Sequence, residues 1–255
     1  ENVMELENKS IIITGASSGI GAAAATLFAA EGANVILGAR RSAELEAVVS
    51  KIREAGGTAV FLEGDVKDEG YAAALVDLAL KEFGQLDGAF NNAGIVGAME
   101  PVPDMGIGNW NEVLTVNLTA AFLAAKAQIP VMKKTGGGSI VFTSSFVGFS
   151  NAGMPGMGAY AASKAGLNGL VQSLASDHAA EGIRAHALMP GGTITPAGGE
   201  GNPDVLAFIA GLHPMKRMAD AREIAQAALF LLSDRASFMT GSPTIVDGGM
   251  SIRLT

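Results

Sequence analysis

A tyrosine and a lysine, Tyr160 and Lys164, stand four residues apart in a segment whose composition favours a helix. Residues at positions i and i+4 leave the same face of a helix, so the two side chains are expected to lie side by side. A free tyrosine titrates near ~10, and a cation held close to it stabilises the phenolate relative to the phenol. The pair could therefore exchange a proton with a substrate oxygen near neutral pH. The same spacing also arises by chance on many helices, so the rest of the chain is needed to tell a catalytic pair from a chance pair.

The surrounding sequence alternates short apolar runs with longer helical stretches. We expect strands at 10–14, 35–37, 59–62, 88–91, 139–143, 183–188 and 244–246, and helices at 19–31, 42–55, 70–83, 110–134, 158–179 and 221–232. Strands separated by helices of this length form a parallel sheet with right-handed crossovers. The prediction is an α/β fold with a doubly wound, seven-stranded parallel sheet (a Rossmann fold) and helices on both faces, as a single domain over residues 4–255.

The composition limits the possible functions. The chain has 255 residues and a net charge of -8, so nucleic acid and anionic membrane surfaces are poor candidate partners. It has no cysteine, which removes disulfides and thiolate chemistry, and its three histidines show no metal-ligand spacing, so we expect no metal. We see neither a signal-peptide pattern nor an uninterrupted apolar run of ~18 residues, and expect a cytoplasmic protein outside the membrane. Only 16% of the residues are charged, so we expect an oligomer to bury part of the surface.

A glycine-rich loop lies where the first predicted strand turns into the first predicted helix. Its sequence is Thr14-Gly15-Ala16-Ser17-Ser18-Gly19-Ile20-Gly21. Glycines let the backbone approach a pyrophosphate closely, and the free N–H groups at the start of a helix favour negative charge. A structural turn could carry the same glycines, but the position at the first strand-to-helix junction favours a dinucleotide site.

Two arginines, Arg40 and Arg41, follow the second predicted strand. A dinucleotide site recognises the adenosine ribose here, with a carboxylate for a free 2′-hydroxyl or a basic group for a 2′-phosphate. Because this position has no carboxylate and two guanidiniums, the site is expected to prefer NADP(H) over NAD(H). The alternative is that both arginines are solvated surface residues.

With these motifs in order, the chain resembles the short-chain dehydrogenases/reductases over almost its whole length. Asp65-Val66 resembles the pair that meets the adenine, and Asn91-Asn92-Ala93-Gly94 the turn that supports the sheet beside the cofactor. The catalytic set implied by the resemblance is Asn117, Ser145, Tyr160 and Lys164. The implied cofactor-binding residues are Gly15, Ser17, Ser18, Gly19, Ile20, Gly21, Arg40, Arg41, Asp65, Val66, Asn92, Ala93, Gly94, Tyr160, Lys164, Pro190, Gly191, Thr193 and Thr195.

The resemblance also implies a role for each catalytic residue. Tyr160 would exchange a proton with the oxygen of a small carbonyl or alcohol substrate, and Ser145 would hydrogen-bond that oxygen. Lys164 would bind the nicotinamide ribose and depress the pKa of Tyr160. Asn117 would hold a water that links Lys164 to solvent. Ser144 is an alternative to Ser145, because the spacing from the serines to the tyrosine is about two residues longer than is usual in the family.

The segment 197–218 occupies the position of the family's substrate-covering loop. It places glycines and a proline around the apolar stretch 205–209, which suits a mobile lid with a short helix, although an ordinary surface loop would look similar. Phe146, Phe149, Met154 and Phe208 suggest an apolar substrate, but such side chains also fill cores. The small residues after Tyr160 would permit close helix approach, and the resemblance implies a homotetramer.

The leading hypothesis is an NADP-preferring oxidoreductase that interconverts a carbonyl compound and an alcohol. One alternative is a catalytically silent NADP-binding regulatory protein, since a fold does not determine a function. A second alternative is a sugar-nucleotide epimerase or dehydratase, which shares the tyrosine and lysine. Enzymes of that class resemble longer chains with an added substrate domain, for which this chain has no room.

Overall fold

A computed structural model describes residues 4–150, 154–199 and 201–252. Its centre is a seven-stranded sheet in the order β3-β2-β1-β4-β5-β6-β9, in which every neighbouring pair is parallel. The strands are β1 (Ser10–Thr14), β2 (Asn34–Ala39), β3 (Thr58–Glu63), β4 (Gly88–Asn91), β5 (Gly138–Thr143), β6 (Ile183–Pro190) and β9 (Pro243–Val246). The predicted doubly wound fold is confirmed.

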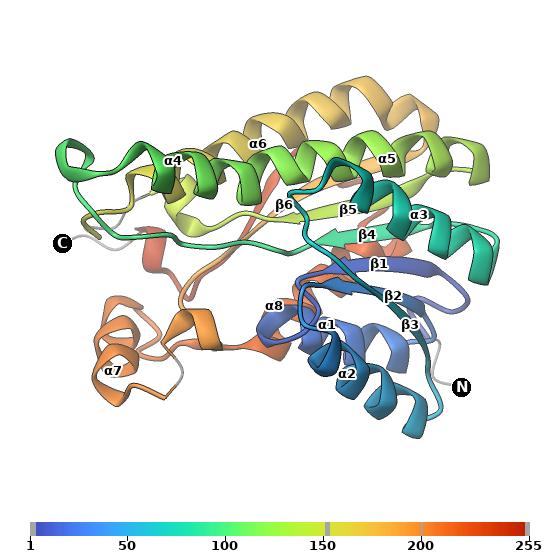
Figure 1. Cartoon of the computed structure of the whole chain (residues 1–255), viewed down its shortest axis with the longest axis horizontal. Coiled ribbons are helices and arrows are strands. Elements are labelled where there is room, and N and C mark those ends of the chain that lie inside the picture. Colours follow the sequence, from blue (N-terminus) through green and yellow to red (C-terminus); the bar gives the residue numbers. More distant parts are fainter. Residues whose placement is uncertain (1–3, 151–153, 200, 253–255) are drawn as a thin grey trace.

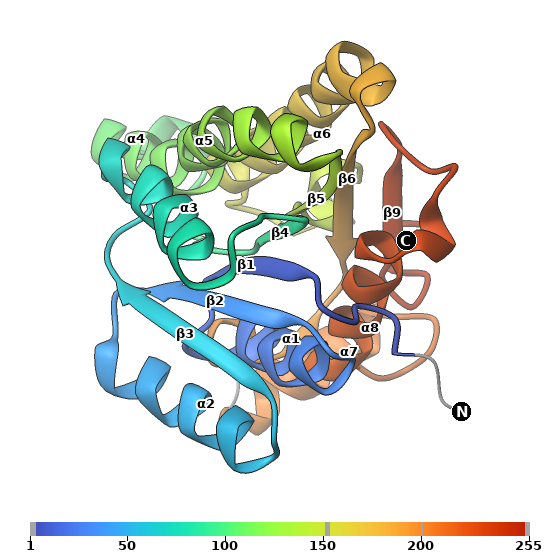
Figure 2. The ribbon, with the colours of Figure 1, turned by 90° about the vertical axis from the view of Figure 1, so that its right-hand side faces the viewer.

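Helices cover both faces of this sheet (Figures 1 and 2). One layer contains α1 (Gly19–Ala30), α2 (Ser42–Glu54) and α8 (Ala221–Leu232), and the other contains α3 (Glu69–Phe83), α4 (Ile107–Leu114), α5 (Ala120–Thr135) and α6 (Gly158–His178). The strands are therefore buried on both sides, which explains why β1 reads as an unbroken apolar run rather than an alternating one.

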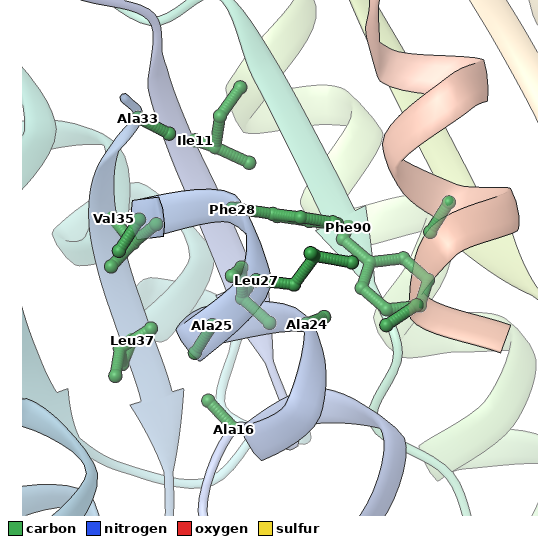
Figure 3. Close-up of a cluster of buried hydrophobic side chains, with 14 of the residues drawn as sticks. Ile11, Ala16, Ala24, Ala25, Leu27, Phe28, Ala33, Val35, Leu37 and Phe90 are labelled. Carbon is green, nitrogen blue, oxygen red and sulfur yellow. The ribbon is translucent and has the colours of Figure 1, made fainter. Parts of the chain in front are cut away.

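A separate apolar core fills each gap between the sheet and a helical layer. In the gap under α1, Phe28 meets Phe90 of β4 with ring centroids 6.1 Å apart (Figure 3). Alanines line much of the rest of α1, so this helix lies close to the strands. The packing fixes the start of α1, and with it the glycine-rich loop, relative to the ends of β1 and β4.

The structure differs from expectation in the helix predicted at 110–134. The run begins at Ile107 and is divided into α4 and α5 by a π-helical turn, Thr115–Thr119. A π turn inserts a residue into the helical ladder and is typical of functional sites, and Asn117 lies within it. Hydrophobic periodicity predicts the helix but carries no signal for a single widened turn.

The run 107–135 is long and apolar enough to cross a membrane by length and composition alone, with a mean hydropathy of 1.2 in its most apolar window. Half of that window is buried inside the fold, where α5 packs against α3 and the sheet. The core helix of a globular protein passes the same test, so the run by itself is weak evidence for a membrane span.

The lid segment 197–218 contains α7 (Pro203–Leu212), as the apolar stretch at 205–209 predicted. In Figure 1, α7 lies outside the two helical layers. A small second sheet, which the sequence did not predict, closes the base of the segment: β7 (Thr193–Ile194) pairs in parallel with β8 (Ala219–Asp220). We call this pair the clasp.

Candidate active site

The first turns of α6 bring the tyrosine and lysine together. The Lys164 Nζ lies 5.5 Å from the centroid of the Tyr160 ring. Lys164 is only 3% exposed, and its ammonium donates to the carbonyl oxygen of Thr143 at 2.6 Å. Burial lowers the pKa of Lys164 to about 7, because the charged form loses its hydration.

Burial dominates the pKa of Tyr160 as well. It raises the pKa of the phenol above 10.0, and the hydrogen bond with the Ser145 hydroxyl partly opposes that rise. The expected depression of the Tyr160 pKa is therefore wrong for the protein groups alone, because desolvation raises this pKa by more than the Ser145 hydroxyl lowers it. A further positive charge beside the phenol would be needed to reverse the direction.

The two adjacent serines have different partners. The Ser145 hydroxyl contacts Tyr160 and also accepts from the backbone N–H of Val147 at 3.3 Å. The Ser144 hydroxyl donates to the carbonyl oxygen of Lys164 at 2.8 Å, so it ties β5 to α6. Only Ser145 is thus directed at the phenol, which favours it over Ser144 as the group that would hold a substrate oxygen.

Asn117 holds three segments together. Its Oδ1 accepts from the N–H of Ile95 at 2.8 Å, and its Nδ2 donates to the Ile95 carbonyl at 2.8 Å and to the Ser163 hydroxyl at 3.0 Å. A Cβ on Gly94 would lie 3.2 Å from both the Asn117 Oδ1 and the Lys164 Nζ. The π turn therefore positions the turn after β4 against α6, and the role of Asn117 in a proton relay stays a prediction.

A cleft of about 350 Å³ runs from these residues across the carboxyl ends of the strands. The following predicted residues line it: Gly15, Ser17, Ser18, Gly19, Ile20, Arg40, Arg41, Asp65, Val66, Asn92, Ala93, Gly94, Tyr160, Lys164 and Thr195. At the edge of an open α/β sheet, this is where dinucleotides bind.

The glycine-rich loop is shaped for close approach. Gly15 and Gly19 have φ of 67° and 53°, values that residues with a side chain rarely adopt. A Cβ on Gly15 would lie 3.0 Å from the Ala93 Cα, and one on Gly21 would overlap the Gly15 carbonyl. The start of α1 therefore borders the cleft with backbone that carries few side chains of its own, and the loop fits a pyrophosphate.

The two arginines differ in their contacts. Arg41 donates to the hydroxyls of Ser17 and Ser18 at 3.0 and 2.9 Å and pairs with Glu44 at 3.3 Å. Arg40 lies exposed at the same wall of the cleft. Opposite them, Lys67 bridges Asp65 at 3.7 Å and Glu112 of α4 at 3.0 Å.

Several predicted residues lie away from the cleft wall. Gly21 instead lets α1 pack on the loop, and Asn117 and Ser145 act through the contacts described above. Pro190, Gly191 and Thr193 do not line the cleft either, and the Thr193 hydroxyl donates to the Gly191 carbonyl at 3.1 Å. Their contact with the nicotinamide stays a prediction.

Sequence reasoning missed other residues of the wall: Ala39, Gly64, Ile95, Val96, Glu112, Val116, Thr143, Pro196 and Ala197. Most directly follow or precede a predicted motif and could have been found by extending it by one residue. Glu112 and Val116 come from α4 and the π turn, and only the tertiary approach of that helix brings them to the cleft. Within the described part of the chain, no group of three or more His, Asp or Glu side chains could hold a metal ion.

Comparison with known proteins identifies this architecture. The model of a family described as enoyl-(acyl carrier protein) reductase matches residues 15–251. The chain is 39% identical over 250 residues to the 2,5-dichloro-2,5-cyclohexadiene-1,4-diol dehydrogenase of Sphingobium indicum. The alignment covers 97% of this chain and 98% of that protein. The chain belongs to the short-chain dehydrogenase/reductase family.

Two further likenesses support this short-chain dehydrogenase/reductase. The cis-4-hydroxycyclohexanecarboxylate dehydrogenase of Sinomonas cyclohexanicum is 40% identical over 238 residues, 93% of this chain and 94% of that protein. The crystal structure of levodione reductase superposes with a TM-score of 0.93 at 33% identity, covering 98% of this chain and 100% of that chain. The protein is therefore an oxidoreductase that acts on the CH–OH or C=O group of a small molecule with a nicotinamide cofactor, and this reading is favoured over a silent regulatory protein.

Proposed function

We propose that this enzyme prefers NADP(H) and interconverts an alicyclic secondary alcohol and its ketone, with Tyr160 as the general acid and base. The observation that carries the proposal is the approach of the Ser145 hydroxyl and the buried Lys164 ammonium to Tyr160, with the Lys164 Nζ 5.5 Å from the ring centroid. Tyr160 and Lys164 line the cleft that also contains the glycine-rich loop, and Ser145 reaches it through its contact with Tyr160. Two hydroxyls directed at one point are the donors that a carbonyl oxygen requires.

Tyr160, Ser145 and Lys164 each have a separate role in the proposed reaction. A bound nicotinamide cofactor supplies or accepts the hydride at the substrate carbon. In the reduction direction, the O–H bond of Tyr160 breaks and its proton passes to the substrate oxygen, leaving a phenolate. Ser145 holds that oxygen by donating a hydrogen bond. The ammonium of Lys164 stabilises the phenolate, and the reverse reaction returns the proton to Tyr160.

The cofactor preference rests on the wall formed by Arg40 and Arg41. Arg41 already lies across the hydroxyls of Ser17 and Ser18, so its guanidinium is held at the side where the adenosine ribose would bind. A guanidinium offers planar paired donors to a phosphate, whereas a 2′-hydroxyl is bound best by a carboxylate. The nearest carboxylates at this end, Glu44 and Asp65, are engaged in ion pairs.

The substrate class rests on two independent supports. The two dehydrogenases to which the chain is similar are both named for a hydroxyl group on a six-membered carbon ring. In this chain, an apolar cluster that includes Phe146, Val147 and Met157 packs beside Tyr160, and Phe149, which follows that cluster in sequence, and Phe208 of α7 are exposed. Apolar walls with two hydroxyl donors suit a ring ketone with little polar decoration.

For the assembly we propose a homotetramer in the cytoplasm. The support is an apolar groove between α5 and α6 that contains Phe122, Ile129, Pro130, Leu170 and Leu174. Phe122 is exposed there, although large apolar side chains usually find a partner surface. Light scattering at micromolar concentration should report four chains, and a monomer would contradict the proposal.

A steady-state screen tests the proposed function. The purified chain is offered NADPH or NADH with cyclohexanone, a linear ketone of equal carbon number, a 3-oxoacyl thioester and a sugar. We expect the highest kcat/KM with the ring ketone and NADPH. Turnover of the thioester or sugar alone would contradict the substrate class, and equal kcat/KM with both cofactors would contradict the cofactor preference.

A further inference from the structure

One buried histidine, His213, connects the C-terminal end of α7 to the rest of the fold. His213 directly follows α7 and is 2% exposed, whereas the residues of α7 are exposed or only partly buried. The Nδ1 of His213 lies 2.8 Å from the carbonyl oxygen of Ile209, and its Nε2 lies 3.0 Å from the backbone nitrogen of Gly192. The ring therefore joins α7 to the backbone immediately after β6.

These two partners fix the protonation of the ring. A carbonyl oxygen can only accept, so Nδ1 carries a proton, and a backbone N–H can only donate, so Nε2 carries none. The imidazole of His213 is neutral, and both of its nitrogens are used. A side chain that fills the same volume without an acceptor would leave the Gly192 N–H unpaired.

Glycine backbone surrounds the ring. A Cβ on Gly191 would lie 2.9 Å from the His213 Nε2, one on Gly192 would lie 2.8 Å from Cε1, and one on Gly248 would lie 3.3 Å from Cδ2. The first two distances are shorter than real Cβ contacts, so glycine at 191 and 192 makes room for the imidazole. The site is shaped around this side chain.

The backbone that His213 contacts at Gly192 continues into β7 of the clasp and then reaches the cleft. The Gly192 carbonyl accepts from the N–H of Ala219 at 2.9 Å, so Gly192 is bonded both to His213 and to the residue that follows the lid segment. Three residues after Gly192, Thr195 lines the cleft and its side chain lies over Gly19. A shift of α7 would therefore be transmitted to the cofactor side through Gly192.

We propose that His213 is a positioning residue. Its Nδ1-protonated ring holds α7 over the substrate side by connecting the helix to Gly192, in the backbone segment that continues to the cofactor cleft. His213 itself does not line the cleft. The inference rests on the proposed function for its kinetic consequence but not for its structural one. It predicts that substrate affinity depends on the bond from Gly192 to Nε2.

The unmodified protein provides the first test. Long-range 1H–15N correlation NMR should show His213 as the Nδ1–H tautomer, which is the less common form of free histidine. A protonated Nε2 in the native protein would overturn the proposal. This measurement needs no variant and no activity, so neither misfolding nor an incorrect proposed function affects its reading.

Three substitutions separate the two bonds. His213→Gln can place an acceptor near the position of Nε2 and so keep the bond from the Gly192 N–H. His213→Asn can place a donor near Nδ1 and so keep only the bond to the Ile209 carbonyl, and His213→Leu keeps neither bond. We expect amide exchange at Gly192 to be faster by about tenfold in the Leu and Asn variants and close to wild type in the Gln variant. His178→Leu, at the far end of α6, is the matched control and should leave Gly192 unchanged.

The kinetic readout distinguishes positioning from general stability. His213→Leu should raise the KM for cyclohexanone by about tenfold with kcat changed less than about threefold, and His213→Gln should restore most of the KM. Equal KM values in the Gln and Leu variants, or a lower melting temperature with an unchanged KM, would overturn the proposal. If cyclohexanone is not turned over by wild type, the proposed function fails, while the tautomer and the exchange rates still decide the structural role of His213.

Discussion

Helix α1 begins at the cleft and α7 follows the residues Thr195, Pro196 and Ala197 that line it, but the two helices are held in opposite ways. Helix α1 buries half of its length against the sheet, with Phe28 0% exposed (Figure 3). Helix α7 leaves Phe208 65% exposed and is held by the clasp, by its Asn202 cap and by His213. Apolar burial holds the cofactor side rigid, whereas a few hydrogen bonds of about 1 kcal/mol each hold the substrate side.

This difference matches what each side must do. A pyrophosphate is common to every turnover, so a loop fixed by the core can be shaped for it in advance. A substrate must enter, be covered and leave, which requires a segment that can move at small cost in free energy. The proposed catalytic residues Ser145, Tyr160 and Lys164 lie just after β5 and in the first turns of α6.

The largest expected effect comes from a phenylalanine on each helix. Phe28→Ala should lower the free energy of unfolding by about 3–5 kcal/mol, because the cavity lies in a close-packed core. Phe208→Ala should change it by less than about 0.5 kcal/mol, because the side chain is already in solvent. Urea unfolding of both variants measures the contrast, and similar losses would show that α7 is packed as firmly as α1.

The next largest effect is expected in the pH dependence of stability, which reports the titration of the buried Lys164. Its pKa is lowered by burial to about 7 in the folded protein, against 10.5 for the unperturbed group, so above pH 7 the folded chain loses a proton that the unfolded chain keeps. Stability must therefore rise with pH in this window. Relative to Lys164→Met, wild type should gain about 2 kcal/mol of unfolding free energy between pH 7 and pH 9. Parallel curves for the two proteins would mean that Lys164 stays charged inside the fold.

A smaller effect is expected at the exposed edge of the cofactor side. Arg41→Ala removes the guanidinium beside Ser17 and Ser18 and should lower kcat/KM with NADPH by about tenfold, while kcat/KM with NADH changes little. Arg222→Ala, on α8 and outside the cleft wall, is the control for a lost surface charge. If both cofactors lose activity equally, Arg41 supports the loop rather than reading the phosphate.

The sequence predicts the side that contains α1 better than the side that contains α7. The strands, the helices and the glycine-rich loop carry periodic or local signals, and the loop residues line the cleft as expected. The clasp is too short to leave a pattern, and the approach of Glu112 depends on tertiary packing. Likewise, His213 reads as a surface or packing residue, because its partner Gly192 is distant along the chain.

One expectation failed for an energetic reason. The spacing of Tyr160 and Lys164 is correct, but spacing alone does not reveal that burial raises the pKa of the phenol and lowers that of the amine. The segment around Gly191 was assigned to the nicotinamide by resemblance, which stays a prediction, and its packing against His213 left no signal in the sequence. Desolvation and side-chain packing are properties of the folded chain that a motif does not encode.

Single-turnover hydride transfer in Tyr160→Phe tests the central claim most directly. The variant keeps the ring beside Lys164 and removes only the phenolic oxygen. The account predicts a rate of NADPH oxidation by the ring ketone lower by about 10²–10⁴-fold, with the Kd for NADPH within about threefold of wild type. A rate equal to that of wild type would remove Tyr160 from the reaction.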